Sequence, residues 1–153
     1  MTTPEERIES LGLTLPSAHP VVANYSACIT SGDLIFIAGH GPFVNGHPAY
    51  LGKVGAEVSL DVAREAARVV VLNILGTLKA ELGELSRIRR WVRAFVMVNG
   101  APTFHEHYLV ADGATDLLVA IFGAAGRPAR SAVGLSLPFD IAVEIEAMVE
   151  VDP

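Results

Sequence analysis

Residues 141–151 alternate apolar and polar side chains, which is the pattern of a β-strand with one buried face. Successive side chains of a strand point to opposite faces of a sheet, so a strict alternation separates the two kinds of side chain. The apolar face carries Ile141, Val143, Ile145, Ala147, Val149 and Val151, and the other face carries Glu144, Glu146, Met148 and Glu150. The chain is therefore expected to build a sheet with one face against a core and one face outside it.

Residues 60–82 carry a second strong pattern, an apolar stripe at helical spacing. The stripe consists of Val62, Ala66, Val69, Val70, Asn73, Ile74, Thr77 and Leu78, which lie mostly three or four residues apart. Ser59 can cap the first turn, Asp61 stands near the positive end of the helix, and Gly83 follows its last residue. These signals predict a long helix with one broad face on the sheet.

Shorter patterns predict the remaining elements and their order. A short helix is predicted over residues 4–11, and a second long helix from Asp112 or Ala114 to Phe122. The other predicted strands are residues 25–30, 34–38, 90–98 and 131–135, of which the first two form a hairpin. This order favours an α+β fold with a mixed β-sheet and two helices packed on one face.

Length, composition and charge limit the organisation and the partners of the chain. No linker interrupts it, so residues 1–153 are expected to form one domain, with residues 1–20 as a peripheral N-terminal helix and loop. Charged residues make up only 18%, below the roughly 25% of typical soluble domains. Some apolar surface is therefore expected outside the core of a single chain, and an oligomer is expected to cover it.

The net charge of −6 disfavours nucleic acid as a partner, because phosphate binding needs clustered cations. Interrupted apolar runs and an acidic start predict no membrane span and a cytoplasmic location.

The sequence offers no motif for a metal or a cofactor. Cys28 is the only cysteine, which excludes an intrachain disulfide and a cluster of thiolate ligands. His105 and His107 lie two residues apart, whereas a separation of four would place both on one helical face. Gly39 is not followed by a dinucleotide-binding fingerprint. We therefore expect no metal and no cofactor.

Arg130 and Glu144 are the residues best suited to chemistry on a small carboxylate. The planar guanidinium of Arg130 offers two parallel donors and keeps its charge at any working pH. A carboxylate such as Glu144 can orient a water molecule or carry a proton beside a bound substrate. The two residues stand on successive strands and are expected to form a charge pair on neighbouring strands. The alternative interpretation treats each as a solvated surface residue.

Three short motifs resemble the signature of the YjgF/RidA family, also called the Rid or endoribonuclease L-PSP family. The motifs are Pro128-Ala129-Arg130-Ser131-Ala132-Val133, Leu137-Pro138 and Val143-Glu144-Ile145-Glu146-Ala147. The resemblance extends over about residues 22–151, and Gly113-Ala114-Thr115-Asp116-Leu117-Leu118 resembles a longer-chain subgroup. It implies a chorismate-mutase-like fold of the Bacillus type, assembled as a homotrimer with clefts between the subunits.

The resemblance also implies an activity and a set of site residues. Family members of the deaminase type hydrolyse 2-imino and 2-enamino acids, such as 2-iminopropanoate and 2-aminoacrylate, to 2-oxo acids and ammonia without a cofactor. Arg130 matches the arginine that holds the substrate carboxylate, and Glu144 matches the glutamate that positions the attacking water. Tyr25 matches a tyrosine of the cleft, Gly39 matches a backbone contact, and His40 stands beside them.

Three residues depart from the family pattern. Ala132 replaces a frequent cysteine, His40 replaces a frequent glutamine, and Asp112 replaces a frequent asparagine. A negative charge at Asp112 would disfavour an anionic substrate if it faced the cleft. These departures keep two alternatives open. One is a noncatalytic trimer that binds a small carboxylate metabolite, and the other is a ribonuclease.

Overall fold

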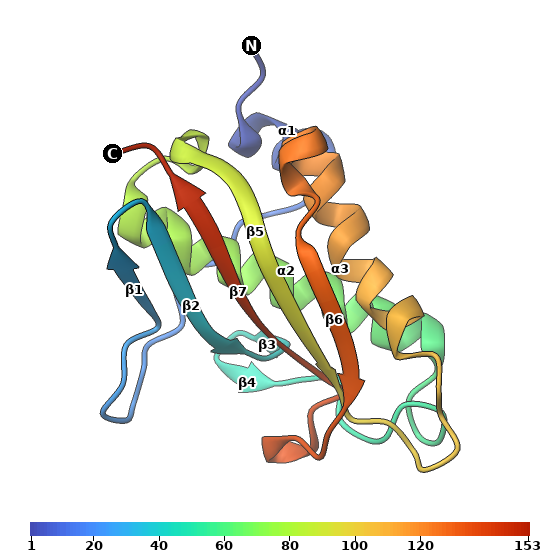
Figure 1. The fold of residues 1–153 in the computed structure, drawn as a ribbon. Helices are drawn as coiled ribbons and strands as arrows, with labels where there is room; N and C mark the ends of the chain where they lie inside the picture. The colour runs from blue at the N-terminus through green and yellow to red at the C-terminus, as the bar shows by residue number, and fades with distance from the viewer.

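A computed structural model describes residues 1–153, which form a mixed sheet covered by helices on one face (Figure 1). The sheet has five strands in the order β1-β2-β7-β5-β6, and only β5 and β6 run parallel. The strands are β1 (Cys28–Ser31), β2 (Leu34–His40), β5 (Ile88–Val98), β6 (Ala129–Gly134) and β7 (Val143–Val151). The chain thus has an α+β fold with a mixed sheet, as the sequence predicted.

Two helices, α2 (Leu60–Leu82) and α3 (His107–Phe122), cover the same face of the sheet, as the sequence predicted (Figure 1). The Ser59 side chain accepts a hydrogen bond from the Val62 amide at the start of α2, and Gly83 ends the helix with a φ of 80°. The prediction for α3 was wrong at its start, since the helix begins at His107. Gly113 lowers helix propensity in its middle, yet α3 needs it there because an added Cβ would lie 2.4 Å from the Arg64 carbonyl oxygen of α2.

Alternation along β7 separates the two faces of the sheet as predicted. Val143, Ile145, Ala147, Val149 and Val151 are each at most 7% exposed and belong to the core. Glu144 and Glu146 project from the other face, together with exposed apolar side chains of the neighbouring strands. These are Ile29 on β1, Phe36 on β2 and Val133 on β6. An apolar sheet face without helices is therefore left open in the single chain.

The segment before β7 departs from the predicted strand. The sequence placed residues 141 and 142 in the strand, but the ladder begins at Val143 and Ile141 makes only an isolated bridge to Leu51. Before it, the short helix η3 (Pro138–Asp140) contains two residues with positive φ, Phe139 at 60° and Asp140 at 57°. The irregular backbone therefore takes the chain out of the ladder at this end of β7.

Short elements complete the structure around this core. The helix α1 (Pro4–Ser10), whose Ile8 is buried, contacts α3. The remaining short helices are η1 (Leu85–Arg87) and η2 (Gly123–Gly126). The ribbon β3 (Phe43–Val44) and β4 (His47–Pro48) follows β2. The stretch from α3 to η2 is long and apolar enough to cross a membrane, but α3 packs on α2 and the sheet as a core helix.

Candidate functional site

Glu144 and Gly39 meet where β7 and β2 lie side by side. A Cβ added at Gly39 would lie 3.0 Å from Oε1 of Glu144 and 3.1 Å from its Cδ. The ladder between the two strands shifts register between Ile37 and His40, so the backbone of Gly39 bulges here. The missing side chain at Gly39 thus allows the Glu144 carboxylate to lie directly over the neighbouring strand.

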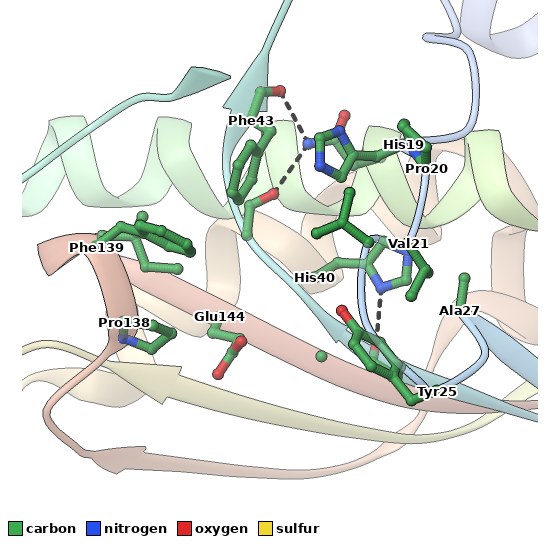
Figure 2. A pocket seen from close by; sticks show the side chains of 16 residues that line it. His19, Pro20, Val21, Tyr25, Ala27, His40, Phe43, Pro138, Phe139 and Glu144 are labelled. Atoms are coloured by element: carbon green, nitrogen blue, oxygen red, sulfur yellow. Dashed lines mark hydrogen bonds between the residues drawn. The ribbon is translucent and has the colours of Figure 1, made fainter. Parts of the chain in front are cut away.

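A cavity of about 330 Å³ opens beside this carboxylate (Figure 2). Its lining includes four residues predicted from the sequence: Tyr25, Gly39, His40 and Glu144. The rest of the wall was not predicted as part of a site, and it consists of His19, Pro20, Val21, Val22, Ala27, Ala38, Gly41, Phe43, Asn73, Pro138, Phe139 and Ile141. Most of these residues are apolar and come from loops, where no periodic pattern marks them. The cavity is therefore an apolar pocket with one carboxylate.

The electrostatic setting of Glu144 favours its protonated form. Burial raises the pKa of the Glu144 carboxyl above its ordinary value, and the negative charge of Glu146 on the same strand raises it further. No arginine or lysine lines the cavity to oppose these effects. A carboxyl group with a raised pKa can both release and accept a proton closer to neutral pH.

His40 lines the same cavity but uses both ring nitrogens within its own chain. Nδ1 lies 2.6 Å from the carbonyl oxygen of Ala38, and Nε2 lies 2.8 Å from Oγ1 of Thr77 on α2. Since a carbonyl oxygen only accepts, Nδ1 carries the proton and Nε2 accepts from the threonine hydroxyl. Burial lowers the pKa of His40, which keeps the ring neutral. The imidazole is thus a fixed, neutral part of the wall.

Asn73 connects α2 to the loop on the other side of the cavity. Its Nδ2 donates to the carbonyl oxygens of Gly41 and Phe43, at 2.9 and 3.0 Å. These two bonds hold the loop that carries the Phe43 ring into the wall (Figure 2). From the sequence, Asn73 was predicted only as a member of the apolar stripe of the helix. Its polar side chain was the one signal of another role, because a buried polar group needs a hydrogen-bond partner.

Arg130 lies outside this cavity, at the edge strand β6. Its Nη1 donates to Oδ1 of Asp112 at 2.7 Å and to Oγ1 of Thr115 at 3.0 Å, both on α3. A longer contact of 3.4 Å joins Nη2 to the carbonyl oxygen of Tyr108. The carboxylate of Asp112 is therefore bound to the arginine, and the guanidinium uses three of its five N–H donors in these contacts, which leaves Nε and one hydrogen of Nη2.

The expected charge pair between Arg130 and Glu144 on neighbouring strands is wrong for the single chain. Strand β5 lies between β6 and β7. Arg130 pairs with Ala94 of β5, which pairs with Ala147 of β7, so these three residues share the face covered by helices. Glu144 is three positions from Ala147 and projects from the opposite face. One chain alone cannot bring both groups to one small ligand.

The structure contains no group of three or more His, Cys, Asp or Glu side chains that could hold a metal ion. His105 and His107, which were weighed as metal ligands from the sequence, do not line the cavity. The His107 ring packs edge-on against the Phe104 ring, with the centroids 5.3 Å apart. The polar side chains that line the cavity are those of His19, Tyr25, His40, Asn73 and Glu144.

Comparison with known families and proteins gives consistent matches. The model of a family described as "YjgF/chorismate mutase-like, putative endoribonuclease" matches residues 5–140. The protein TCP17 of Trypanosoma cruzi is 37% identical over 147 residues, which cover 95% of this chain and 92% of that protein.

Solved structures place the chain close to two bacterial proteins. Atu1372 of Agrobacterium tumefaciens, described as of unknown function, is 43% identical with a TM-score of 0.92, over 97% of this chain and 92% of that chain. A Shewanella oneidensis protein with an endoribonuclease description is 33% identical with a TM-score of 0.94, over 97% and 99%. The YjgF protein of Escherichia coli shares the fold at 23% identity and a TM-score of 0.62, over 88% of this chain and 93% of that chain.

Proposed function

Because the chain belongs to the YjgF/RidA family, we propose that it hydrolyses reactive 2-imino and 2-enamino acids to 2-oxo acids and ammonia. The observation that carries this proposal is the half-buried Glu144 carboxylate, which faces an apolar cavity and has a raised pKa. Hydrolysis of an imine needs a water molecule oriented toward carbon and a proton relay to nitrogen, and a single carboxyl group can supply both.

The proposed reaction uses Glu144 twice. First, as a carboxylate, it accepts a proton from water while the water oxygen bonds to C2 of the imine, and it passes this proton to the imine nitrogen, which gives a tetrahedral adduct with a hydroxyl and an amino group. Second, it accepts the proton of that hydroxyl group and transfers it to the amino nitrogen while the C–N bond breaks, so that ammonia leaves and the C–O bond becomes the carbonyl of the 2-oxo acid. Glu144 ends as the carboxylate with which it began, so the enzyme is unchanged. These steps require no cofactor.

We further propose that the substrate carboxylate binds to Arg130 of a second copy of the chain. No cation lines the cavity, and Arg130 lies across the sheet from Glu144. The open sheet face with Ile29, Phe36 and Val133 offers apolar area for an assembly. A homotrimer with a cleft between each pair of subunits would place Arg130 of one subunit near Glu144 and Tyr25 of the next.

A coupled assay tests the deaminase proposal. An amino acid oxidase or a dehydratase generates 2-iminopropanoate in place, and the formation of pyruvate is followed with and without the protein. We expect acceleration by the wild type, and its loss in Arg130→Ala and Glu144→Gln. Glu146→Gln, on the same strand face, and Arg127→Ala, near Arg130, are the matched controls. If the wild type accelerates no imino acid in the assay, the deaminase proposal is wrong.

Two observations favour a second candidate function, the binding of a small carboxylate metabolite without turnover. Ala132 provides no thiol two residues from Arg130, and His40 uses both ring nitrogens within its own chain and is not free to move a proton. Calorimetry with pyruvate distinguishes this function from catalysis. Binding that Arg130→Ala abolishes and Glu144→Gln preserves, in a protein without turnover, would establish it. A ribonuclease function remains the weaker alternative, because the net charge of −6 opposes phosphate binding.

A further inference from the structure

Phe139 is held in an unusual backbone conformation at the edge of the cavity. Its φ of 60° and ψ of 13° lie in the left-handed region, and Asp140 follows with a φ of 57°. Residues other than Gly, Asn, Asp and His rarely adopt this region, and a bulky residue such as Phe139 stays there only where its surroundings fix it. Phe139 as a residue is nevertheless 68% exposed, so burial of its own side chain does not explain the conformation.

The contacts of Asp140 explain what fixes this segment. Its carboxylate accepts a hydrogen bond of 2.9 Å from Nδ2 of Asn99, which is 1% exposed, and its carbonyl oxygen accepts one of 2.7 Å from the Gly52 amide. Asn99 is held in turn by Lys53, whose Nζ donates to Oδ1 at 2.6 Å. A polar network around the buried Asn99 thus anchors Asp140, and the preceding Phe139 lines the cavity.

Phe139 is one of three rings in a row. Its ring meets the Phe43 ring edge-on, with centroids 6.1 Å apart and planes at 88°, and the Phe43 ring lies 4.7 Å from that of His19. Figure 2 shows Phe139 and Phe43 beside the cavity, with Glu144 reaching in from β7. Aromatic rings prefer such offset and edge-on contacts to face-to-face stacking, and the ring of a ligand can make the same contacts with exposed rings. We call His19, Phe43 and Phe139 the aromatic wall.

We propose that the aromatic wall selects 2-imino acids that carry an aromatic side chain, such as 2-imino-3-phenylpropanoate, over 2-iminopropanoate. This inference rests on the proposed deaminase function and specifies its substrate class. The methyl group of 2-iminopropanoate cannot fill an apolar cavity of about 330 Å³, whereas a phenyl group on C3 adds apolar surface for the aromatic wall, which lines the same cavity as Glu144. Phe139 is thereby a specificity-determining residue.

Turnover of two substrates tests the inference. Each imino acid is generated in place by an amino acid oxidase, and kcat/KM is compared. We expect the phenyl substrate to be preferred at least about tenfold, since even one methylene group in an apolar pocket is worth that factor. Phe139→Ala should remove about tenfold of kcat/KM for the phenyl substrate and leave that for 2-iminopropanoate within about twofold. Phe139→Leu should fall between them.

Controls separate this inference from the proposed function. Val44→Ala removes an exposed apolar side chain that does not line the cavity, and it should leave the preference unchanged. Equal kcat/KM for both substrates in the wild type would overturn the inference while the deaminase function stands. If no imino acid is turned over, the binding of phenylpyruvate and pyruvate still reports on the wall: tighter binding of phenylpyruvate, lost in Phe139→Ala, supports it, and equal binding overturns it. An equal loss for both substrates with a changed oligomeric state in Phe139→Ala would make Phe139 a subunit contact instead.

Discussion

Arg130 and Glu144 project from opposite faces of the same sheet, with the whole of strand β5 between their strands. Arg130 is bound to Asp112 on the helical side, and Glu144 lies over Gly39 on the other side. If both act on one substrate, they have to come from different subunits. This relationship leads to the first prediction.

Mixed assemblies of two inactive variants should regain activity. Arg130→Ala and Glu144→Gln subunits are unfolded together and refolded at equal amounts, so that they assemble at random. A cleft is intact when one subunit supplies Arg130 and its neighbour supplies Glu144, which happens in about a quarter of clefts of a cyclic oligomer. We expect about a quarter of the wild-type deaminase rate. If both groups of a site came from one subunit, the mixture would stay inactive.

Asp112→Asn should strengthen the binding of an anionic substrate. The carboxylate of Asp112 lies 2.7 Å from Nη1 of Arg130 and offsets its charge, whereas an asparagine would orient the guanidinium without offsetting it. We expect KM for 2-iminopropanoate to fall several-fold, and the stability to change by less than about 1 kcal/mol because the pair is partly exposed. Asp116→Asn is the control, because it removes another carboxylate of α3, which is paired with Arg64 of α2. An unchanged KM would contradict the prediction.

Gly39→Ala should reduce turnover with little loss of stability. The new Cβ would lie 3.0 Å from Oε1 of Glu144, and the end of this flexible side chain can move away. The core then keeps its packing, while the Glu144 carboxylate moves away from its position over strand β2. We expect kcat to fall at least about tenfold, since a misplaced catalytic group loses most of its advantage. Thermal unfolding monitors the fold, and a variant with wild-type kcat would show that the position of the carboxylate is not critical.

The stability of the protein should depend on the ionisation of Glu144. Burial and Glu146 raise the pKa of Glu144 in the folded state above its value in the unfolded chain. The folded state then binds more protons between the two pKa values, so the contribution of this group is most favourable below the unfolded pKa and declines as the pH rises through the folded one. We expect Glu144→Gln to be more stable than the wild type at neutral pH, with the difference closing in acid.

Urea unfolding over a pH series measures this effect. Glu146→Gln provides the comparison, because Glu146 is exposed and its charge only adds to the shift at Glu144. Glu146→Gln should also move the acidic limb of the pH–rate profile to slightly lower pH, because it removes one of the two causes that raise the pKa of Glu144. The shift should be small because burial is the larger cause of the raised pKa. A Glu144→Gln variant that is less stable than the wild type at neutral pH would contradict the assignment of a raised pKa.

Local patterns in the sequence predicted the framework of the fold well. The alternation in residues 143–151 predicted strand β7, and the apolar stripe in residues 60–82 predicted helix α2. Both predictions were possible because the spacing of apolar residues along each element shows which face is buried. The start of α3 was missed, since Gly113 weakens the helical pattern where close contact with α2 requires it. The family motifs also marked Tyr25, Gly39 and Glu144, which line one cavity in the structure.

The sequence by itself determined the fold class, the family and the residue types of the candidate site. Only the tertiary structure decided their arrangement: that Arg130 and Glu144 occupy opposite faces, that Asp112 is bound to the arginine, and that Phe139 completes a wall of rings. The physical reason is that strand order and register are set by packing across the whole sheet. Contacts between loops distant in sequence, such as those of Asp140 with Asn99, likewise leave no local period to detect.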